Sequence, residues 1–526
     1  MTRSRWKTAA VLPNAVLAVF SLSHQASAQS KEPYPGLEAY IANAAQTWGI
    51  PGVAVAIVRN DSVIYVKGFG RLSADSKTPV NERTLFEIGS STKAFTATAV
   101  AMLVSEGKMR WDQRLTDFLP DFRMSDPVAN TSATLRDALS HRTGIARGEL
   151  VWLASGIGRD EVLHRLRFLK PESLFRTQFS YQNMLFLAAG QAVGKAAGST
   201  WDEVVRQRIF TPLGMTSSAP TYSGVTNPNI ARGHGIEHDT AFIKPPFDAD
   251  NIGPAGSILS NAVDMAQWLR FQLNDGQANG KRLLSSAAFR ETHTSQIIVP
   301  VGSLGGGGLD SVPTSHFSTY GFGWIIEDYR GNLVWQHGGN TEGMTAAVGM
   351  LPDKKFGVVV LSSMGQASLP GLLQRYIFDL ELGVLKRDLS AEARTRFVAQ
   401  RRRADSTAKV QEAKTNRNAQ SPIPLSAFVG TFADSLYGTV NIVMKDGQLE
   451  LERGTWRGKL EFLNANNFLW YVPKSAPVPP LIIKFEIAAD NTVTGLYYGL
   501  GADATLLSRV KPRAANGQPD GDGGGR

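Results

Sequence analysis

The chain has 526 residues, carries a formal net charge of +9 and contains no cysteine. The absence of cysteine excludes a disulfide framework, a thiolate nucleophile and a cysteine-ligated metal site, and the length is sufficient for two or more domains with cores of their own. The excess charge lies in the first residues and in residues 386–417, which hold ten basic and four acidic side chains. Because the remainder is formally neutral, we expect no nucleic-acid partner.

The N-terminus has the pattern of a secretory signal. Basic residues precede a mostly apolar segment at residues 9–22, and small residues follow at 26–28. This order predicts a signal peptide at residues 1–28 and a periplasmic or secreted protein, with an uncleaved anchor as the alternative. No later stretch reaches about eighteen uninterrupted apolar residues, so we expect no integral membrane span after signal cleavage.

The predicted elements of the mature chain begin with a helix and a β-hairpin. Apolar residues recur at helical spacing between Leu37 and Trp48. Two apolar runs, 53–58 and 63–67, flank a polar turn at residues 59–62. This pattern predicts a pair of antiparallel strands.

The first chemical motif follows the hairpin. A short apolar run ends at Gly89, and Ser90 opens a helix-compatible segment, with Lys93 one turn further on. Residues three apart lie on the same helix face, so this spacing places the lysine amine beside the serine hydroxyl. A helix N-terminus also favours developing negative charge. Ser90 is therefore a candidate nucleophile, and Lys93 can be its base if burial or neighbouring charge lowers the pKa of the amine.

The motif also has a purely structural interpretation. The same Ser-x-x-Lys spacing occurs at Ser4 and at Ser406, so the spacing alone is weak. Ser90 could equally be an ordinary helix N-cap. Catalysis is indicated only by the strand, the glycine and the helix around Ser90.

A second motif lies within the helix-rich segment that extends from Ser90 to about residue 273. Tyr181 and Asn183 precede a helix-compatible run at residues 184–197. A tyrosine near a neutral lysine can relay a proton to a leaving group, and an asparagine amide can hold both the lysine and a substrate carbonyl. The alternative is a loop tyrosine followed by an N-cap asparagine.

A third motif comes where strand-like runs return, at residues 323–327, 333–336, 345–351 and 356–361. The second run leads into His337, Gly338, Gly339 and Asn340. Glycines allow close approach of a substrate backbone, and such a strand can supply a backbone N–H to an oxyanion hole. A lone His-Gly-Gly is more often a turn after a strand. The glycine-rich stretch at residues 301–309 is expected to be a surface insertion, with a flap near the site as the alternative.

In this order, the Ser-x-x-Lys, Tyr-x-Asn and His-x-Gly motifs resemble those of serine hydrolases related to class C β-lactamases and penicillin-binding proteins. Further stretches in the style of that family lie at residues 135–145, 212–215, 254–257 and 320–324, so that the likeness covers about residues 37–382. The resemblance implies an α+β domain at residues 29–385, with a β-lactamase/transpeptidase-like antiparallel sheet and a helical subdomain.

The resemblance also implies roles for the motif residues. Ser90 would be the acylated nucleophile, Lys93 its base and Tyr181 the second proton-transfer group. Asn183 would bind Lys93 and the substrate. The N–H groups of Ser90 and Asn340 would form the oxyanion hole.

The chain departs from the family at His337, which stands where many relatives have the lysine of Lys-Thr-Gly. With Gly338 and Gly339 beside it, this segment would line the substrate, but it offers no hydroxyl and only a titratable imidazole. The departure weakens the β-lactamase and D,D-carboxypeptidase interpretations. It leaves relatives that resemble D-aminopeptidases, other peptidases of small unusual peptides, and esterases.

The C-terminal part has a different pattern. Residues 386–424 are predicted to be a basic, partly helical linker, and residues 512–526 a glycine-rich, disordered tail. Between them, residues 425–511 contain eight short strand-like runs with turns, which predict a small all-β antiparallel barrel. This barrel resembles the lipocalin-like modules that follow some of these hydrolases.

The sequence therefore predicts an exported serine hydrolase that cleaves amide bonds of small or non-standard peptides through an acyl-enzyme and needs no cofactor. The alternatives are a carboxylesterase with the same site and a non-catalytic binding protein with a retained fold. No metal site is expected, because His234 and His238 are four residues apart but no glutamate sits beside His234 as in His-Glu-x-x-His, and Gly235 disfavours a helix there. The sequence leaves the oligomeric state open.

Overall fold

The computed structural model describes residues 1–2, 32–237, 240–300, 315–385, 387–414, 420–473 and 480–511. The predicted signal peptide beyond its first two residues, the glycine-rich stretch at 301–309 and the tail at 512–526 lie outside the described residues. Within those described ranges, no helix is both long enough and apolar enough to cross a membrane. Residues 32–526 form one unit.

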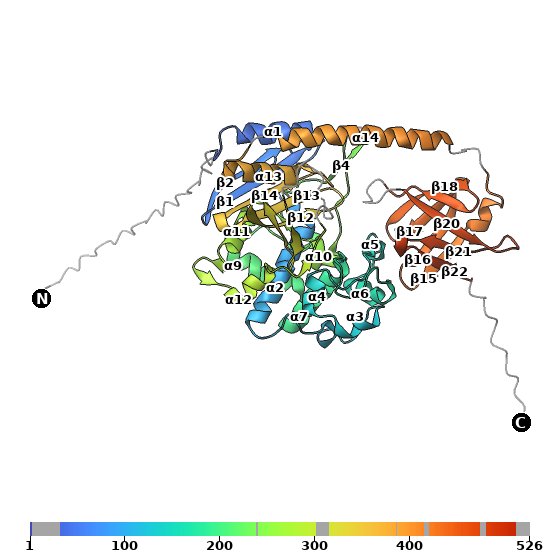
Figure 1. The fold of residues 1–526 in the computed structure, drawn as a ribbon, viewed down its shortest axis with the longest axis horizontal. Helices are drawn as coiled ribbons and strands as arrows, with labels where there is room; N and C mark the ends of the chain where they lie inside the picture. The colour runs from blue at the N-terminus through green and yellow to red at the C-terminus, as the bar shows by residue number, and fades with distance from the viewer. Residues whose placement is uncertain are drawn as a thin grey trace, which may run out of the picture. The chain divides into compact units, whose positions relative to one another are not determined.

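An antiparallel sheet organises the first part of this unit (Figure 1). Among the described residues, its eight strands follow the order β2-β1-β14-β13-β12-β11-β10-β9. Their bounds are β1 Gly52–Arg59, β2 Ser62–Gly70, β9 Ile297–Ile298, β10 Ser318–Tyr320, β11 Ile325–Tyr329, β12 Asn332–Asn340, β13 Thr345–Leu351 and β14 Phe356–Ser362. Strands β1 and β14, from opposite ends of the domain, pair from Val53↔Ser362 to Arg59↔Phe356. The predicted sharing of one antiparallel sheet by both ends of the domain is therefore confirmed.

The hairpin of β1 and β2 is closed by Asn60 and Asp61, whose φ angles are 47° and 62°. Two successive left-handed residues are typical of the turn whose twist matches that of the flanking strands. The polar turn that the sequence predicts therefore lies between strands paired from Gly52↔Gly70 to Arg59↔Ser62.

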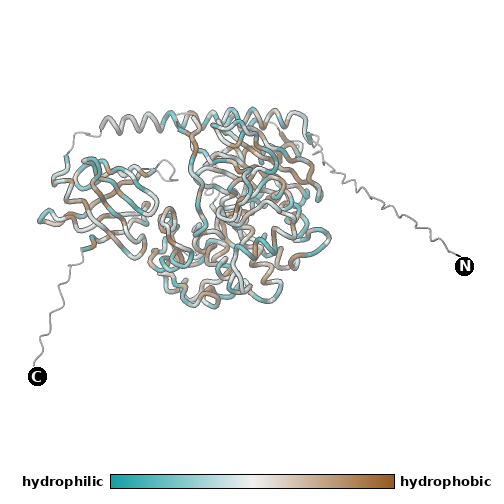
Figure 2. The backbone as a smooth tube through the Cα atoms, turned by 180° about the vertical axis from the view of Figure 1, so that it is seen from behind, coloured by the Kyte–Doolittle hydropathy of each residue, from teal (hydrophilic) through white to brown (hydrophobic). Residues whose placement is uncertain are grey.

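Helices cover both faces of the sheet. Side chains alternate along β1, so Val53 and Ile57 pack on one face with α1, Leu37–Thr47, and α13, Leu369–Leu382. Ala54 and the other even residues of β1 face the helical part on the opposite side. Figure 2 shows hydrophobic residues along the inner strands and hydrophilic residues in many of the turns.

The helical part holds the elements that carry the chemical motifs. Helix α2, Thr92–Ser105, is buried on nearly all sides because α7, α10 and α12 pack around it. The α-helices of this part are α2 Thr92–Ser105, α3 Pro127–Ser132, α4 Leu135–Leu139, α5 Glu149–Trp152, α6 Arg159–Arg165, α7 Asn183–Ala197, α8 Trp201–Val205, α9 Thr211–Leu213, α10 Gly253–Gly256, α11 Ala262–Leu273 and α12 Ser286–Thr292. Short strand pairs join them: β3 Phe86–Glu87 with β6 Leu259–Ser260, β4 His234–Glu237 with β5 Thr240–Ile243, and β7 Gln277–Ala278 with β8 Lys281–Arg282.

The helix α14, Leu389–Lys414, lies in the predicted linker and is followed by the predicted barrel. Eight strands within the described ranges 420–473 and 480–511 close that barrel, with β15 paired to β22. They are β15 Gly430–Asp434, β16 Gly438–Lys445, β17 Gln448–Arg453, β18 Trp456–Asn464, β19 Asn467–Trp470, β20 Leu481–Ile487, β21 Val493–Tyr498 and β22 Thr505–Arg509. Alternate residues point inward, as Leu481, Ile483 and Phe485 do in β20. The barrel prediction is confirmed.

Candidate active site

Ser90 lies in a short 3-10 turn, Gly89–Ser91, directly before α2. Gly89 has a φ of +49°, and a Cβ there would come within 2.8 Å of the backbone nitrogen of Asn340. Glycine is therefore required at this position, and the turn approaches the end of β12 closely. The hydroxyl of Ser91 reinforces that contact by donating to the carbonyl oxygen of His337 at 3.2 Å. Ser90 itself is only half-buried, so a substrate can reach it.

Lys93 is completely buried beneath Ser90. Its Nζ lies 3.0 Å from Ser90 Oγ, 2.7 Å from Asn183 Oδ1 and 2.8 Å from the carbonyl oxygen of Ala255. Burial holds the pKa of the amine well below its usual value of 10.5; the nearby Glu149 carboxylate opposes this shift, and Arg147 adds to it. A lowered pKa leaves part of the amine neutral at ordinary pH, as a base requires.

The contacts of Lys93 direct its lone pair toward the serine. A neutral amine has two N–H bonds and one lone pair. The oxygens of Asn183 and Ala255 are hydrogen-bond acceptors and cannot donate. Each of them therefore accepts one of the two N–H groups of the amine. The lone pair then remains for the proton of Ser90, the third neighbour.

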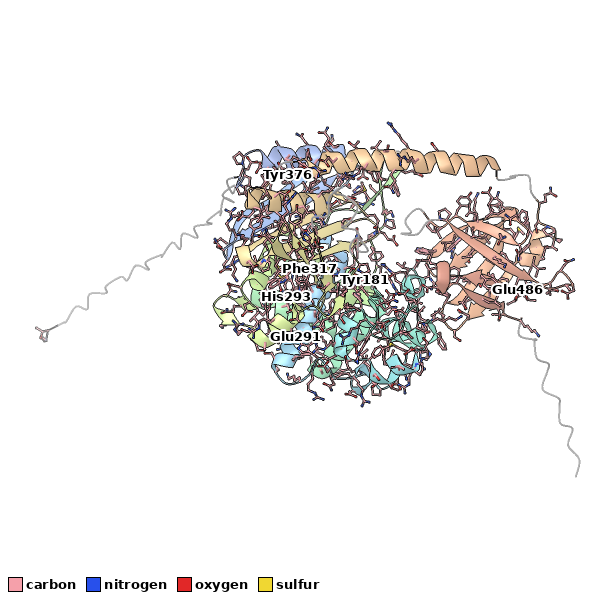
Figure 3. All side chains as sticks on the ribbon, in the orientation of Figure 1. Tyr181, Glu291, His293, Phe317, Tyr376 and Glu486 are labelled. Carbon is pink, nitrogen blue, oxygen red and sulfur yellow. The ribbon has the colours of Figure 1, made fainter. Side chains whose placement is uncertain are left out.

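Tyr181 contacts Ser90 from the other side. Its hydroxyl lies 2.8 Å from Ser90 Oγ, and the residue is placed where the helical part meets the sheet (Figure 3). Burial raises the pKa of this phenol above its usual value of 10.0. Tyr181 therefore stays protonated and can donate a proton.

Asn183 begins α7 and is held in one orientation. Its Oδ1 accepts from Lys93, while its Nδ2 donates to Glu149 Oε1 at 3.0 Å. Because an amide has distinct donor and acceptor ends, the carboxylate on one end fixes the carbonyl toward the lysine on the other. Asn183 is thus brought together with Ser90, Lys93 and Tyr181.

The glycines of β12 lie against the nucleophile turn. A Cβ on Gly339 would overlap the carbonyl oxygen of Ile88 and lie 3.0 Å from the backbone nitrogen of Ser90. A Cβ on Gly338 would meet its nearest neighbour only at 3.5 Å, in ordinary contact. Gly339 is therefore the glycine that lets β12 reach Ser90, and Asn340 follows it at the strand end.

The side chain of His337 is buried against Tyr320. It is 4% exposed, and its Nε2 lies 2.9 Å from the hydroxyl of Tyr320. Burial, with a smaller effect of Lys93, lowers the pKa of the imidazole from 6.5 to about 3. At neutral pH the ring is uncharged, so it supplies no cation in place of the lysine of Lys-Thr-Gly.

Three further residues surround the site, and none of them is among the predicted site residues. His141, in a left-handed conformation with φ 58°, packs its ring 4.2 Å from that of Tyr181 and accepts from the backbone N–H of Gln182 at 3.0 Å. Arg147 lies 5.1 Å over the Tyr181 ring, and Glu149 holds Asn183. The only sequence signal for any of them is that His141 belongs to a family-like stretch, residues 135–145.

No metal site accompanies this arrangement in the part of the chain that the structure describes. His234 is fully buried, with Nδ1 at 2.8 Å from the carbonyl oxygen of Ser363 and Nε2 accepting from the backbone N–H of Ala74 at 3.0 Å. Its ring is thus used in structural hydrogen bonds, and His238 lies outside the described residues.

Comparisons with known proteins identify relatives of this chain. Residues 37–377 match the model of the Beta-lactamase family, and residues 414–506 match a domain of unknown function, DUF3471. Unguisins hydrolase ungD of Aspergillus violaceofuscus is 27% identical over 79% of this chain and 78% of its own. Penicillin-binding protein 4 of Amycolatopsis lactamdurans is 29% identical over 61% of this chain and 82% of its own.

The fold has solved counterparts. The structure of the octameric penicillin-binding protein homologue from Pyrococcus abyssi superposes with a TM-score of 0.59 and 22% identity, over 90% of this chain and 99% of the other. With the family match over residues 37–377, these findings show that the chain belongs to the Beta-lactamase family of penicillin-binding-protein-like serine hydrolases.

Proposed function

We propose that this chain is an exported serine hydrolase that cleaves amide bonds in small or non-standard peptides through an acyl-enzyme on Ser90. The observation that carries the proposal is the pair of contacts at Ser90 Oγ, with the Lys93 amine at 3.0 Å and the Tyr181 hydroxyl at 2.8 Å. One contact comes from a buried base and the other from a protonated acid. The two groups divide the proton transfers of acyl transfer between them.

In the acylation half, the neutral amine of Lys93 takes the proton of Ser90 as Oγ attacks the substrate carbonyl carbon. The carbonyl oxygen becomes an oxyanion. We assign its stabilisation to the backbone N–H groups of Ser90 and Asn340, since the Gly89 turn and the end of β12 come together there. The carbon–nitrogen bond then breaks, and the amine leaves with a proton from Tyr181.

In the second half, the tyrosinate takes a proton from the attacking water as the water oxygen adds to the ester carbon on Ser90. The protonated Lys93 then gives its proton to Ser90 Oγ as the ester bond breaks, so the acid is released and each group regains its starting protonation state. Tyr181 favours amides over esters as substrates, because an amine needs a proton to leave whereas many alcohols leave more easily. Ester hydrolysis by the same residues is the companion activity to be measured.

The substrate class is supported by two features. The neutral, buried His337 leaves β12 without the cation that Lys-Thr-Gly relatives present, which disfavours β-lactam substrates. The relative named unguisins hydrolase, which aligns with most of this chain, supports a hydrolase. The proposal of export rests only on the order of basic, apolar and small residues in the segment 1–28.

The test is a substrate panel with paired serine variants. D- and L-aminoacyl amides, short peptides, nitrophenyl esters and a chromogenic β-lactam are compared by kcat/KM for the wild type, Ser90→Ala and Ser406→Ala. Ser406 is the matched control, since it has the same Ser-x-x-Lys spacing. We expect peptide or aminoacyl amide turnover that Ser90→Ala abolishes and Ser406→Ala keeps. Unchanged turnover in Ser90→Ala would reject the proposal.

A further inference from the structure

We propose that Glu149 is a positioning residue of the Ser90 site and that the C-terminal barrel, through Arg453 and Asp503, holds the segment that carries it. The inference rests on the proposed function, because it concerns how the Lys93 base is set for acylation. It gives the barrel a role in the reaction although, among the described residues, the hydrogen bonds of Ser90 Oγ come from Lys93 and Tyr181 of the catalytic domain.

Glu149 acts through Asn183. Its Oε1 accepts from Asn183 Nδ2 at 3.0 Å and from Arg147 Nε at 2.6 Å. The first bond fixes which end of the amide faces Lys93, and so keeps one N–H of the amine engaged and its lone pair directed at Ser90. Without the carboxylate, the amide could turn and present an NH₂ donor to the lysine, which would compete for that lone pair.

Glu149 and Arg147 also form an opposed pair of charges beside the lysine. The Glu149 carboxylate raises the pKa of Lys93 and the Arg147 guanidinium lowers it, both against the larger effect of burial. Other titratable groups near this pair are Tyr181, whose hydroxyl stays protonated, the rings of His141 and His337, both kept neutral by burial, and Glu172, which interacts electrostatically with Arg147. Glu149 is therefore the negative charge that tunes the base, and its place depends on the backbone from residue 148 to residue 155.

That backbone is bound to the barrel. Arg453, the last residue of β17, donates from Nη1 to the carbonyl oxygen of Leu153 at 2.9 Å and from Nη2 to that of Val151 at 3.3 Å. The backbone N–H of Thr455 donates to the carbonyl oxygen of Ala154 at 2.9 Å. At the other end of the segment, the N–H of Gly148 donates to Asp503 Oδ2 at 3.2 Å. These contacts bracket Glu149 on both sides.

The chemistry of Arg453 explains why it suits this task. The helix α5, Glu149–Trp152, is so short that its C-terminal carbonyls have few partners within the helix, and a cation there is favourable. Arg453 is only 3% exposed, and its Cζ lies 5.5 Å over the Tyr498 ring inside the barrel. A buried guanidinium with carbonyl partners is costly to leave unpaired, so the barrel and the segment hold each other.

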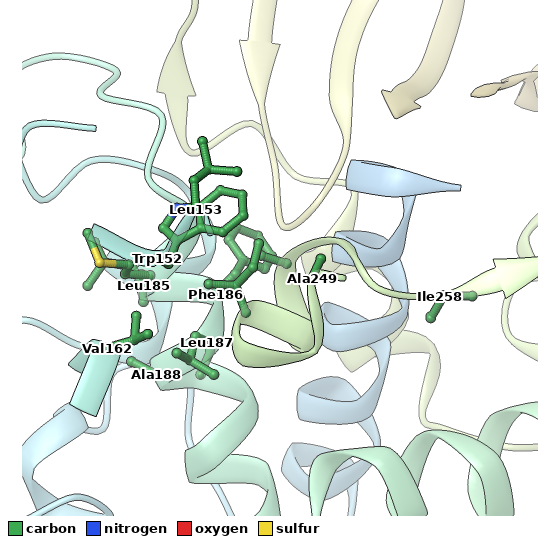
Figure 4. Packing of buried hydrophobic residues seen from close by; sticks show 14 of the residues in the cluster. Trp152, Leu153, Val162, Leu185, Phe186, Leu187, Ala188, Ala249 and Ile258 are labelled. Carbon is green, nitrogen blue, oxygen red and sulfur yellow. The ribbon is translucent and has the colours of Figure 1, made fainter. Parts of the chain in front are cut away.

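The catalytic domain supplies the rest of the support. Asn251 Nδ2 donates to the carbonyl oxygen of Trp152 at 2.9 Å. Trp152 and Leu153 belong to the same buried cluster as Leu185 and Phe186 of α7 (Figure 4). We therefore expect loss of the barrel contacts to displace Glu149 without unfolding the domain.

The test measures how fast an alkyl fluorophosphonate labels Ser90 of the full chain, as a function of pH. Fluoride leaves without help from Tyr181, so the labelling rate reports the Lys93 half of the site. Glu149→Gln removes the charge that raises the lysine pKa, so the acid limb of the profile should move to lower pH. Glu149→Ala should also lower the plateau rate, because the Asn183 amide can then turn its NH₂ group toward Lys93.

The deciding variant is Arg453→Met, with Arg457→Met as its control because Arg457 is 70% exposed on β18 of the same barrel. Arg453→Met should move the acid limb in the same direction as Glu149→Gln. The double variant, Arg453→Met with Glu149→Gln, should move the acid limb no further than Glu149→Gln alone, because both substitutions remove the same effect of Glu149 on Lys93. Arg457→Met should superimpose on the wild type.

A folded Arg453→Met whose profile superimposes on the wild type, or whose rate falls uniformly without a shift of the limb, would overturn the inference. If thermal melting shows that Arg453→Met does not fold, Asp503→Ala is measured and judged by the same criteria. Failure of the underlying function looks different, since Ser90→Ala would then be labelled as fast as the wild type. In that case no pH limb could be attributed to Lys93.

Discussion

Replacing Lys93 with methionine is the most informative single perturbation of the proposed site. Methionine has a similar length and suits a fully buried apolar position, but it has neither a lone pair that can take the proton of Ser90 nor an N–H. Ser90 and Tyr181 keep their contact in this variant, so the change removes the base and leaves the nucleophile and the acid in place.

The expected loss follows from the role assigned to the amine. A positioned general base contributes about 10²–10⁴-fold, so kcat/KM should fall by that factor, which corresponds to a rise of about 3–5 kcal/mol in activation free energy. The change also leaves Asn183 Oδ1 and the Ala255 carbonyl oxygen without their donor, at about 1–3 kcal/mol each if they stay dry. A lower melting temperature should therefore accompany the lower rate.

The assay is stopped-flow acylation by a nitrophenyl ester between pH 4 and pH 9, as judged by the burst of nitrophenolate. In the wild type the rate should rise with pH as Lys93 loses its proton, and then level off well below the usual lysine pKa, because burial lowers that pKa. Lys93→Met should lose this limb. Lys195→Met, at an exposed position of α7, should match the wild type. Acylation by a folded Lys93→Met within threefold of the wild type, or a flat wild-type profile, would refute the assignment.

Other predictions concern the acid, the strand and a buried carboxyl. Tyr181→Phe should lower kcat/KM for an aminoacyl amide by about 10²–10⁴-fold and for a nitrophenyl ester far less, and equal losses would contradict its role as proton donor. Gly339→Ala should abolish fluorophosphonate labelling of Ser90, because a Cβ on Gly339 would overlap the Ile88 carbonyl oxygen. Gly338→Ala is the control and should keep the wild-type melting temperature, because its Cβ would make only ordinary contact. Burial raises the pKa of Glu87 from 4.5 to about 7. The unfolded carboxyl therefore ionises first as pH rises, and the wild type should lose up to about 3 kcal/mol of stability between pH 4.5 and pH 7 through this group. Glu87→Gln should lack that loss in urea titrations at several pH values, and a difference between the two proteins that does not change with pH would contradict this explanation.

The fold could be read from the sequence wherever the signal was local. The hairpin at residues 59–62 combines strand alternation with turn residues that tolerate positive φ, and the barrel strands repeat the same alternation. The Ser90–Lys93 contact follows from helix geometry alone, since three residues separate them. These features depend on neighbours along the chain, and the structure shows them where the patterns indicate.

The rest of the site depends on packing between distant segments. Glu149 reaches Asn183 across 34 residues, and Arg453 reaches Leu153 across 300. Neither pair has a spacing that a motif could reveal. Likewise, the sequence shows an imidazole at His337, but only its burial against Tyr320 shows that the ring is neutral at ordinary pH.

The most direct test of the central claim is the mass of the enzyme during turnover. The full chain is mixed with an aminoacyl ester, quenched in acid within the burst, and examined by intact mass spectrometry and peptide mapping. We predict an added acyl mass located on Ser90 in the peptide that contains residues 86–97, and its absence from Ser90→Ala. Turnover without any acylated serine, or with the acyl group on another residue, would contradict the account.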